Sequence, residues 1–143
     1  ILNRDVVTSR QHFLKVQLPV TYRRLVDLGV REDHSMGFIE APAFRAAAAS
    51  PFHFYDLDRE QSTPLRIFPF QVIDTGFRFY QGLESPEQAL TAVEQIVKTT
   101  KAVNGRFCPV FHNESPSGYG PWKGWSGFYE SVLRIGTDTN ETN

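Results

Sequence analysis

Residues 85–114, SPEQALTAVEQIVKTTKAVNGRFCPVFHNE, predict a helix followed by a buried strand. Ser85 suits an N-cap completed by Gln88, Pro86 suits the first helical position, and Gly105 follows the end of the helix. The face expected to pack inward comprises Ala89, Val93, Ile96, Val97 and Val103. The apolar run after the helix fits a strand buried on both faces. A helix leading into a buried strand is typical of α/β proteins with parallel strands.

The remaining sequence extends this α/β pattern in both directions. We expect a strand within residues 5–18, a helix over 19–29 that ends at Gly29, and a brief strand near 30–36. A long irregular loop then carries the aromatic residues as far as Leu57. Residues 63–75 predict a strong strand, in which Pro69 indicates an edge position or a bulge. A last amphipathic helix is expected over 121–136, followed by a disordered tail at 137–143.

Length and composition limit the classes of protein that this chain can belong to. Of its 143 residues 41% are apolar, which is enough for one ordinary core. A formal net charge of -1 argues against nucleic acid as the main partner. No apolar run approaches the roughly 20 residues of a membrane span, so we expect a soluble chain, with the cytoplasm favoured and the compartment otherwise open. One cysteine, Cys108, excludes an internal disulfide.

Three polar clusters follow the ends of predicted strands. They are Arg10, Gln11 and His12; Asp33, His34 and Ser35; and His112, Asn113 and Glu114. In parallel sheets and barrels, reactive side chains gather where strands end and loops begin, so the three clusters are candidates for one shared site. Each cluster alone is equally compatible with polar groups that are simply satisfied by loop backbone.

Two further groups of residues admit more than one interpretation. Four side chains are of types that bind metal ions, namely His12, Asp33, His34 and His112. Their spacing matches no known metal-binding motif, so we assign no metal ligand in this chain. Trp122 and Trp125, next to Tyr119, could stack on a sugar ring and are candidate substrate-binding residues, although an aromatic cluster at the start of a helix also suits a core.

These clusters resemble motifs of the polysaccharide deacetylases of carbohydrate esterase family four, the NodB-homology proteins. The segment over residues 6–38 resembles the second half of that family, with RQHF in the place of its Arg-x-Pro-Tyr motif and EDHS in the place of Tyr-Asp-Ser-Ser. LRIFPFQVID resembles the next strand, and GRFCPVFHNE the closing Leu-x-His motif. The resemblance covers nearly the whole chain, but His12 replaces the usual proline and Phe13 the usual tyrosine.

The resemblance implies an irregular (β/α)7-type barrel and a metal-dependent hydrolase that removes N-acetyl or related acyl groups from a glycan. By position, Arg10 would orient the catalytic base, the backbone amide near Phe13 would stabilise the oxyanion, and His112 would protonate the leaving amine. Asp33 and Asp74 complete the expected catalytic set.

The family's metal ligands, an aspartate pair and a His-x-x-x-His motif, lie upstream of Ile1 and are not in this sequence. We therefore expect residues 1–136 to be the C-terminal portion of such a domain. The parent protein would bind a divalent metal, with zinc as the first candidate. This chain alone would hold no metal and would be inactive. One alternative is a non-catalytic carbohydrate-binding or scaffold module. Another is a homodimer that covers a sheet edge exposed near Val6 and Val7.

Overall fold

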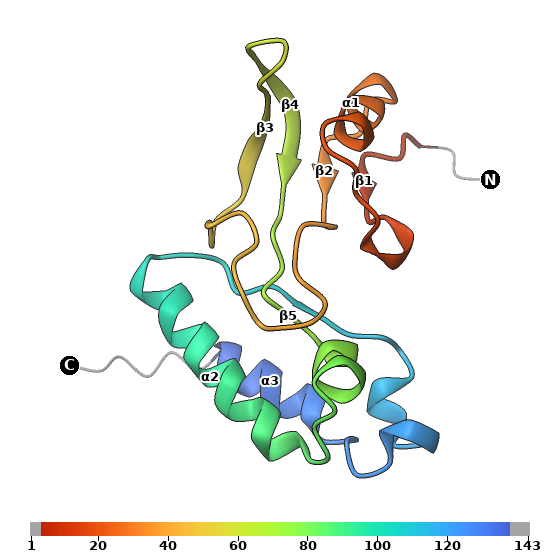
Figure 1. The fold of residues 1–143 in the computed structure, drawn as a ribbon, viewed down its shortest axis with the longest axis vertical. Coiled ribbons are helices and arrows are strands. Elements are labelled where there is room, and N and C mark those ends of the chain that lie inside the picture. The colour runs from red at the N-terminus through yellow and green to blue at the C-terminus, as the bar shows by residue number, and fades with distance from the viewer. Residues whose placement is uncertain (1–3, 138–143) are drawn as a thin grey trace.

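The computed structural model describes residues 4–137 and shows a mixed α/β protein with a sheet at one end and helices at the other (Figure 1). The strands are β1 (Thr8–Ser9), β2 (Glu32–Asp33), β3 (Phe52–Asp56), β4 (Gln61–Ile67), β5 (Val72–Ile73) and β6 (Pro109–Val110). The longer helices are α1 (Val20–Asp27), α2 (Pro86–Ala102) and α3 (Phe128–Thr137). Short helical turns are η1 (His12–Leu14), the π-helix η2 (Gly76–Tyr80), η3 (Ser115–Ser117) and η4 (Gly120–Trp122).

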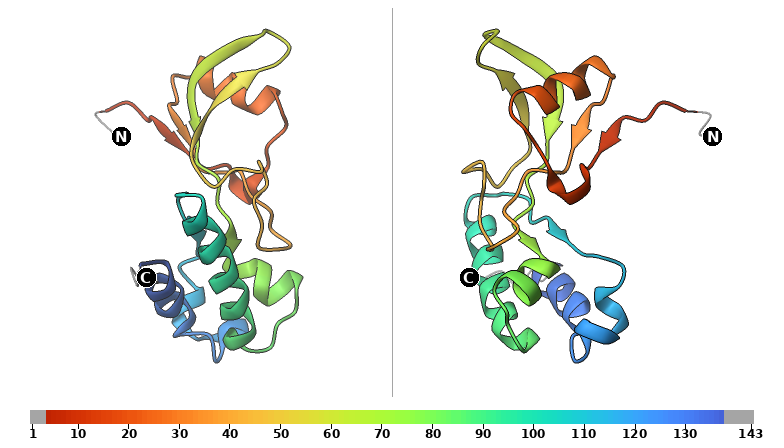
Figure 2. Two further views of the ribbon diagram at one scale, coloured as in Figure 1. Left: turned by 90° about the vertical axis from the view of Figure 1, so that its left-hand side faces the viewer. Right: turned by 45° about the vertical axis from the view of Figure 1, so that its right-hand side comes forward.

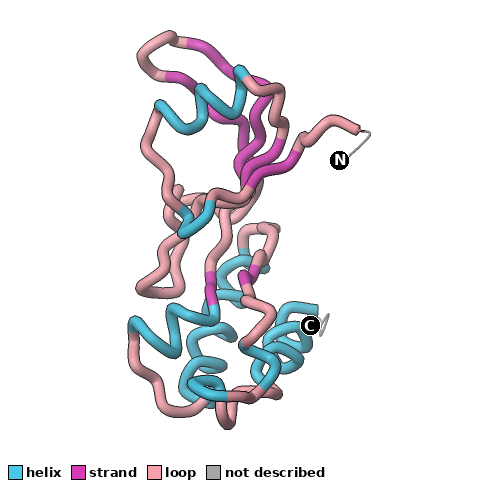
Figure 3. The backbone as a smooth tube through the Cα atoms, turned by 90° about the vertical axis from the view of Figure 1, so that its right-hand side faces the viewer, coloured by secondary structure: helices cyan, strands magenta, loops and turns pink. Residues whose placement is uncertain are grey.

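The larger sheet is mostly parallel, as the sequence predicts. Its strand order is β1-β2-β4-β3, in which β1, β2 and β4 run parallel and β3 is antiparallel to β4. A second, two-stranded parallel sheet joins β5 to β6. No closed barrel is formed by the described residues, because the two sheets do not pair with each other. Figures 2 and 3 show that loops make up most of the connection between the sheet end and the helical end.

The segment from Phe52 to Ile73 differs from its prediction in two ways. The expectation of an irregular loop as far as Leu57 is wrong for residues 52–56, because these form β3 and pair with β4 in a hairpin. The single strand expected over residues 63–75 is divided into β4 and β5, with Pro69 between them. Proline has no N–H to donate to a ladder, so the strand is interrupted there.

Helices α1 and α2 lie close to their predicted positions, but the helix expected over residues 121–136 begins only at Phe128, because η4 and turns occupy residues 120–127. The expectation that Val103 packs inward is wrong, since it is the C-cap of α2 and is 62% exposed. Gly29 comes directly after the C-cap of α1 with a φ of +77°, a left-handed conformation that glycine adopts without a steric penalty. In α2, Ser85 is the N-cap and Pro86 the first residue, although the Ser85 side chain makes no capping hydrogen bond to the backbone. The expected tail begins at Thr137, which is the last residue of α3, and residues 138–143 lie outside the described residues.

Three clusters of buried apolar side chains form the core. The sheet end packs α1 against β4 through Tyr22, Leu25, Val30, Met36, Leu65 and Ile67. The helical end packs α2 and α3 around Val72, Phe77, Ala89, Val93, Val97, Trp122, Trp125, Phe128 and Val132. Between them lies a smaller cluster of Phe70, Ile73 and Val110, with Leu14, Ile39 and Cys108 packed against it. The last cluster forms the floor on which the segments after β1, β5 and β6 meet.

Helix α1 is fastened to the β3–β4 hairpin by an ion pair. The Arg23 guanidinium donates two hydrogen bonds to the buried carboxylate of Asp56 and a third, of 2.8 Å, to Asp58. The Arg23 contact holds the pKa of Asp56 below its usual value of 3.8. A carboxyl group with a lowered folded-state pKa stabilises the fold above its unfolded-state pKa, and that contribution is lost as the pH falls through the folded-state value.

We therefore expect Asp56→Asn to lower the urea midpoint of unfolding at pH 7, and to lower it progressively less as the pH falls below 3.8. The matched control is Asp58→Asn, whose carboxylate is 71% exposed and makes one contact with the same arginine. A pH-independent loss in the Asp56 variant would contradict the assignment of its effect to the ion pair.

The outer side of β1 is a free edge within the part of the chain that the structure describes. No strand among residues 4–137 pairs with it, and Val6 and Val7 are 62% and 46% exposed. Association of two copies through this edge stays a prediction. None of the helices in residues 4–137 combines the length and the apolar character needed to cross a membrane.

Candidate functional site

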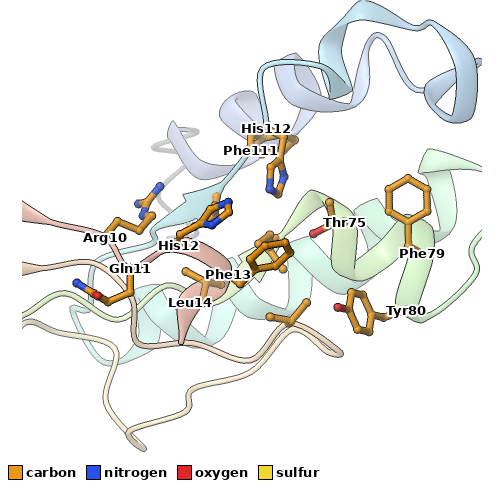
Figure 4. A pocket seen from close by; sticks show the side chains of 13 residues that line it. Arg10, Gln11, His12, Phe13, Leu14, Thr75, Phe79, Tyr80, Phe111 and His112 are labelled. Carbon is orange, nitrogen blue, oxygen red and sulfur yellow. The ribbon is translucent and has the colours of Figure 1, made fainter. Parts of the chain in front are cut away.

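A pocket of about 720 Å³ lies at the junction of the two ends, where the chain leaves β1, β5 and β6 (Figure 4). Its lining consists of Arg10, Gln11, His12, Phe13, Leu14, Ile39, Ile73, Thr75, Phe79, Tyr80, Val110, Phe111 and His112. Because β5 and β6 are parallel, their carboxyl ends deliver Asp74 and His112 to the same edge. The pocket therefore brings together the whole cluster after the first strand and His112 of the cluster after the last strand, whereas Asn113 and Glu114 do not line it.

His112 and Asp74 form a hydrogen-bonded pair in this pocket. The His112 ring nitrogen Nδ1 lies 2.7 Å from Asp74 Oδ1, and the His112 backbone N–H donates to Asp74 Oδ2 over 2.7 Å. The Thr75 backbone N–H donates to Oδ1 as well, so the carboxylate, which is fully buried, has three partners. The His112 side chain is 47% exposed and points into the pocket (Figure 4). A buried carboxylate thus fixes the ring orientation and leaves Nε2 facing the space where a ligand would bind.

The segment after β1 forms the opposite wall in a strained conformation. Phe13 and Leu14 have φ values of +54° and +53°, in the left-handed region that non-glycine residues seldom occupy. Such backbone costs on the order of 1–3 kcal/mol per residue and is concentrated at functional sites. The Phe13 ring belongs to the pocket lining, where it is 70% exposed and its centroid lies 4.4 Å from that of the His12 ring. At the start of this segment, directly after β1, Arg10 Nε donates to the His34 carbonyl oxygen over 3.2 Å.

Asp33, an expected catalytic residue, lies behind the pocket rather than in its lining. It is 0% exposed, and it accepts hydrogen bonds from the Ser35 backbone N–H and hydroxyl at 3.0 and 2.9 Å. Burial raises its pKa, opposed by the hydrogen bonds from Ser35 and Ser9. The Ser35 hydroxyl oxygen accepts the Gln11 N–H over 2.8 Å, so Asp33 supports the pocket wall through Ser35 and is not accessible to a solute.

The tryptophan pair corrects the expectation of a sugar-stacking surface. Trp122 and Trp125 are only 2% and 1% exposed, and their rings pack edge to face with centroids 6.1 Å apart. Trp125 also packs against Phe128 of α3. Neither ring presents a face to a ligand, because both are part of the helical-end core.

Phe79 and Tyr80 are exposed aromatic residues of the pocket that the sequence did not single out. Both belong to η2, which begins two residues after Asp74, and they are 50% and 59% exposed. The available signal was the aromatic run FRFY at residues 77–80, three residues after Asp74. Gly76 permits this helix to lie against the neighbouring loop, since a Cβ there would be 2.3 Å from the Ile39 carbonyl oxygen.

Among residues 4–137 no group of three or more His, Cys, Asp or Glu side chains is arranged to hold a metal ion. Cys108 is partly buried beside the floor cluster, and burial raises the pKa of its thiol, which disfavours the reactive thiolate.

Comparison of the chain with protein-family models, with curated proteins and with solved structures finds no significant match.

Proposed function

We propose that this chain supplies the proton-donating side of a polysaccharide deacetylase-type hydrolase, which removes N-acetyl or related acyl groups from a glycan. The observation that carries the proposal is the His112–Asp74 pair in the pocket. The order of parallel strands, β1-β2-β4 and then β5-β6, is compatible with part of an irregular barrel of the NodB kind. The resemblance implies a divalent metal, with zinc as the first candidate, but residues 4–137 contain no set of ligands for it. The roles proposed for this chain are therefore those of its own side chains and backbone.

His112 acts as the general acid. Hydrolysis of an N-acyl group adds the oxygen of water to the carbonyl carbon, breaks the C–N bond and delivers a proton to the departing nitrogen. Because His112 Nδ1 is hydrogen-bonded to Asp74, the other ring nitrogen, Nε2, is the one that carries the proton to the amine. An imidazole suits this step, since its ring nitrogens can both accept and donate a proton. Asp74 keeps the ring oriented and stabilises the imidazolium form, in the way that a carboxylate supports the histidine of a catalytic triad.

The wall formed by residues 10–14 stabilises the negative charge of the tetrahedral intermediate. Arg10 brings a guanidinium to the lining, and its hydrogen bond to the His34 carbonyl fixes its approach. The left-handed backbone at Phe13 turns this segment toward the pocket, and its amide is the candidate oxyanion donor. Donors fixed before the reaction stabilise developing charge without reorganisation.

The test is a product assay with the full-length natural protein and N-acetylated oligosaccharides. We expect acetate and free amino groups to appear in equal amounts, because one C–N bond is broken per turnover. Binding of the oligosaccharide without any acetate release would favour the alternative, a non-catalytic carbohydrate-binding or scaffold module. Absence of both binding and release would refute a role on acylated glycans.

A further inference from the structure

The aromatic rings of Phe79 and Tyr80 are not used by the chemistry proposed above. Both line the pocket, and half or more of each side chain is exposed to solvent. Figure 4 shows them on η2, on the far side of the Thr75 side chain from the His12 and His112 rings. Two exposed aromatic rings that line the same pocket are a feature of ligand-binding surfaces rather than of ordinary protein surface.

Helix η2 and the Phe79 ring are held in place before any ligand binds. The Phe79 ring packs edge to face on the buried Trp122, with centroids 5.3 Å apart. Arg78 clamps η2 to its surroundings by donating from Nε to the Pro121 carbonyl over 2.8 Å and from Nη1 to the Leu83 carbonyl over 3.1 Å. At the other end, Gln81 Nε2 donates to the Glu40 carbonyl over 3.2 Å. Preorganised side chains lose little conformational entropy on binding, which favours affinity.

We propose that Phe79 and Tyr80 form a binding subsite for a pyranose residue next to the one whose acyl group faces His112, so that the substrate is an oligosaccharide or polysaccharide chain. The inference rests on the proposed function for the position of the reacting residue. A pyranose ring has an apolar face of C–H bonds, which packs on aromatic rings, and a rim of hydroxyl groups, which needs hydrogen-bonding partners or water. The pocket offers both kinds of partner, aromatic rings on η2 and the polar side chains of Arg10, Gln11 and Thr75.

The size and openness of the pocket favour a sugar chain over a long acyl chain. Its volume of about 720 Å³ lies within the range of roughly 300–1,000 Å³ that holds drug-sized ligands, and so exceeds what one acetyl group occupies. An acyl chain is stabilised by complete removal from water. Phe13, Phe79 and Tyr80 are instead 70%, 50% and 59% exposed, so a ligand here keeps one side in solvent, as a sugar with its hydroxyl groups does.

The experiment is calorimetric titration of the full-length natural protein with the monomer and the trimer of N-acetylglucosamine. The trimer is expected to bind at least tenfold more tightly than the monomer. Phe79→Ala and Tyr80→Ala are each expected to weaken trimer binding by about 3- to 10-fold, the size of a single aromatic contact, and to leave monomer binding within twofold. Tyr80→Phe keeps the ring and is expected to bind like the natural protein, which separates the effect of stacking from that of folding.

Tyr119→Ala is the matched control, because Tyr119 is 82% exposed and does not belong to the pocket lining. Equal affinity for monomer and trimer, or trimer binding unaffected by removal of both η2 rings, would overturn the subsite. Acetate release, measured separately, keeps the two proposals apart. Ring-dependent trimer binding without acetate release refutes the hydrolase and leaves the subsite standing. Acetate release at equal kcat/KM from monomer and trimer refutes the subsite and leaves the hydrolase standing.

Discussion

Replacement of His112 by alanine in the full-length natural protein is expected to lower the turnover of N-acyl hydrolysis by about 10²- to 10⁴-fold, the usual contribution of a general acid. The KM is expected to change little, because the imidazole donates its proton in the transition state rather than holding the ground-state substrate. The measurement is steady-state release of acetate. The fold is expected to persist, since the His112 side chain is 47% exposed and packs into no core cluster.

The control for this substitution is His53→Ala. His53 is exposed on β3, where its Nδ1 lies 3.0 Å from the Thr63 carbonyl oxygen of the same hairpin, and it does not belong to the pocket lining. Its removal is expected to leave turnover unchanged. Asp74→Asn is expected to reduce turnover as well, because an amide cannot support the imidazolium as a carboxylate does. Full turnover in the folded His112 variant would show that the acid is another group.

The sequence predicted the elements with strong local signals and missed those without them. Helix α2 has an N-cap, an initial proline and a regular apolar face. Helix α1 is followed by Gly29, at a position whose left-handed backbone favours glycine. Strands β1, β2, β5 and β6 have two residues each, too few for any period to be read from the sequence. The β3–β4 hairpin was missed because the aromatic run in β3 was interpreted as loop.

The two candidate aspartates show why the site was only partly predictable. In the sequence, Asp33 and Asp74 both lie at the end of a predicted strand, and nothing in the local pattern distinguishes them. Asp33 pairs in register with Ile67, whose side chain is buried against α1, so the Asp33 side chain is on the buried face of the sheet. Asp74 follows β5 directly and reaches the pocket edge beside β6. A shift of one residue would exchange the faces, and two-residue strands do not reveal which face each residue takes.

The spacing of the tryptophans did contain the information that they are buried. Trp122, Trp125, Phe128 and Val132 are separated by three, three and four residues, which continues the apolar face of α3 back into the preceding turns. All four belong to the same buried cluster. A position in the core rather than in a binding surface has a distinct consequence, since the loss of a core ring acts on stability whether or not any sugar is present.

Trp125→Ala is accordingly expected to lower the free energy of unfolding by about 3–5 kcal/mol, the usual cost of emptying a large aromatic site. Against a total stability of roughly 5–15 kcal/mol for a domain, that loss moves the urea midpoint far enough to measure by circular dichroism, which does not depend on the removed fluorophore.

Trp125→Phe is expected to cost clearly less than Trp125→Ala. It fills most of the site, and it removes an indole N–H that has no hydrogen-bond partner among the residues that the structure describes. Tyr119→Ala, at an 82% exposed position, is expected to leave the midpoint unchanged. If Trp125→Ala kept full stability and lost only oligosaccharide affinity, the ring would be a binding surface after all. The burial of 99% of that residue, packed between Trp122 and Phe128, makes the loss of stability the outcome that the structure requires.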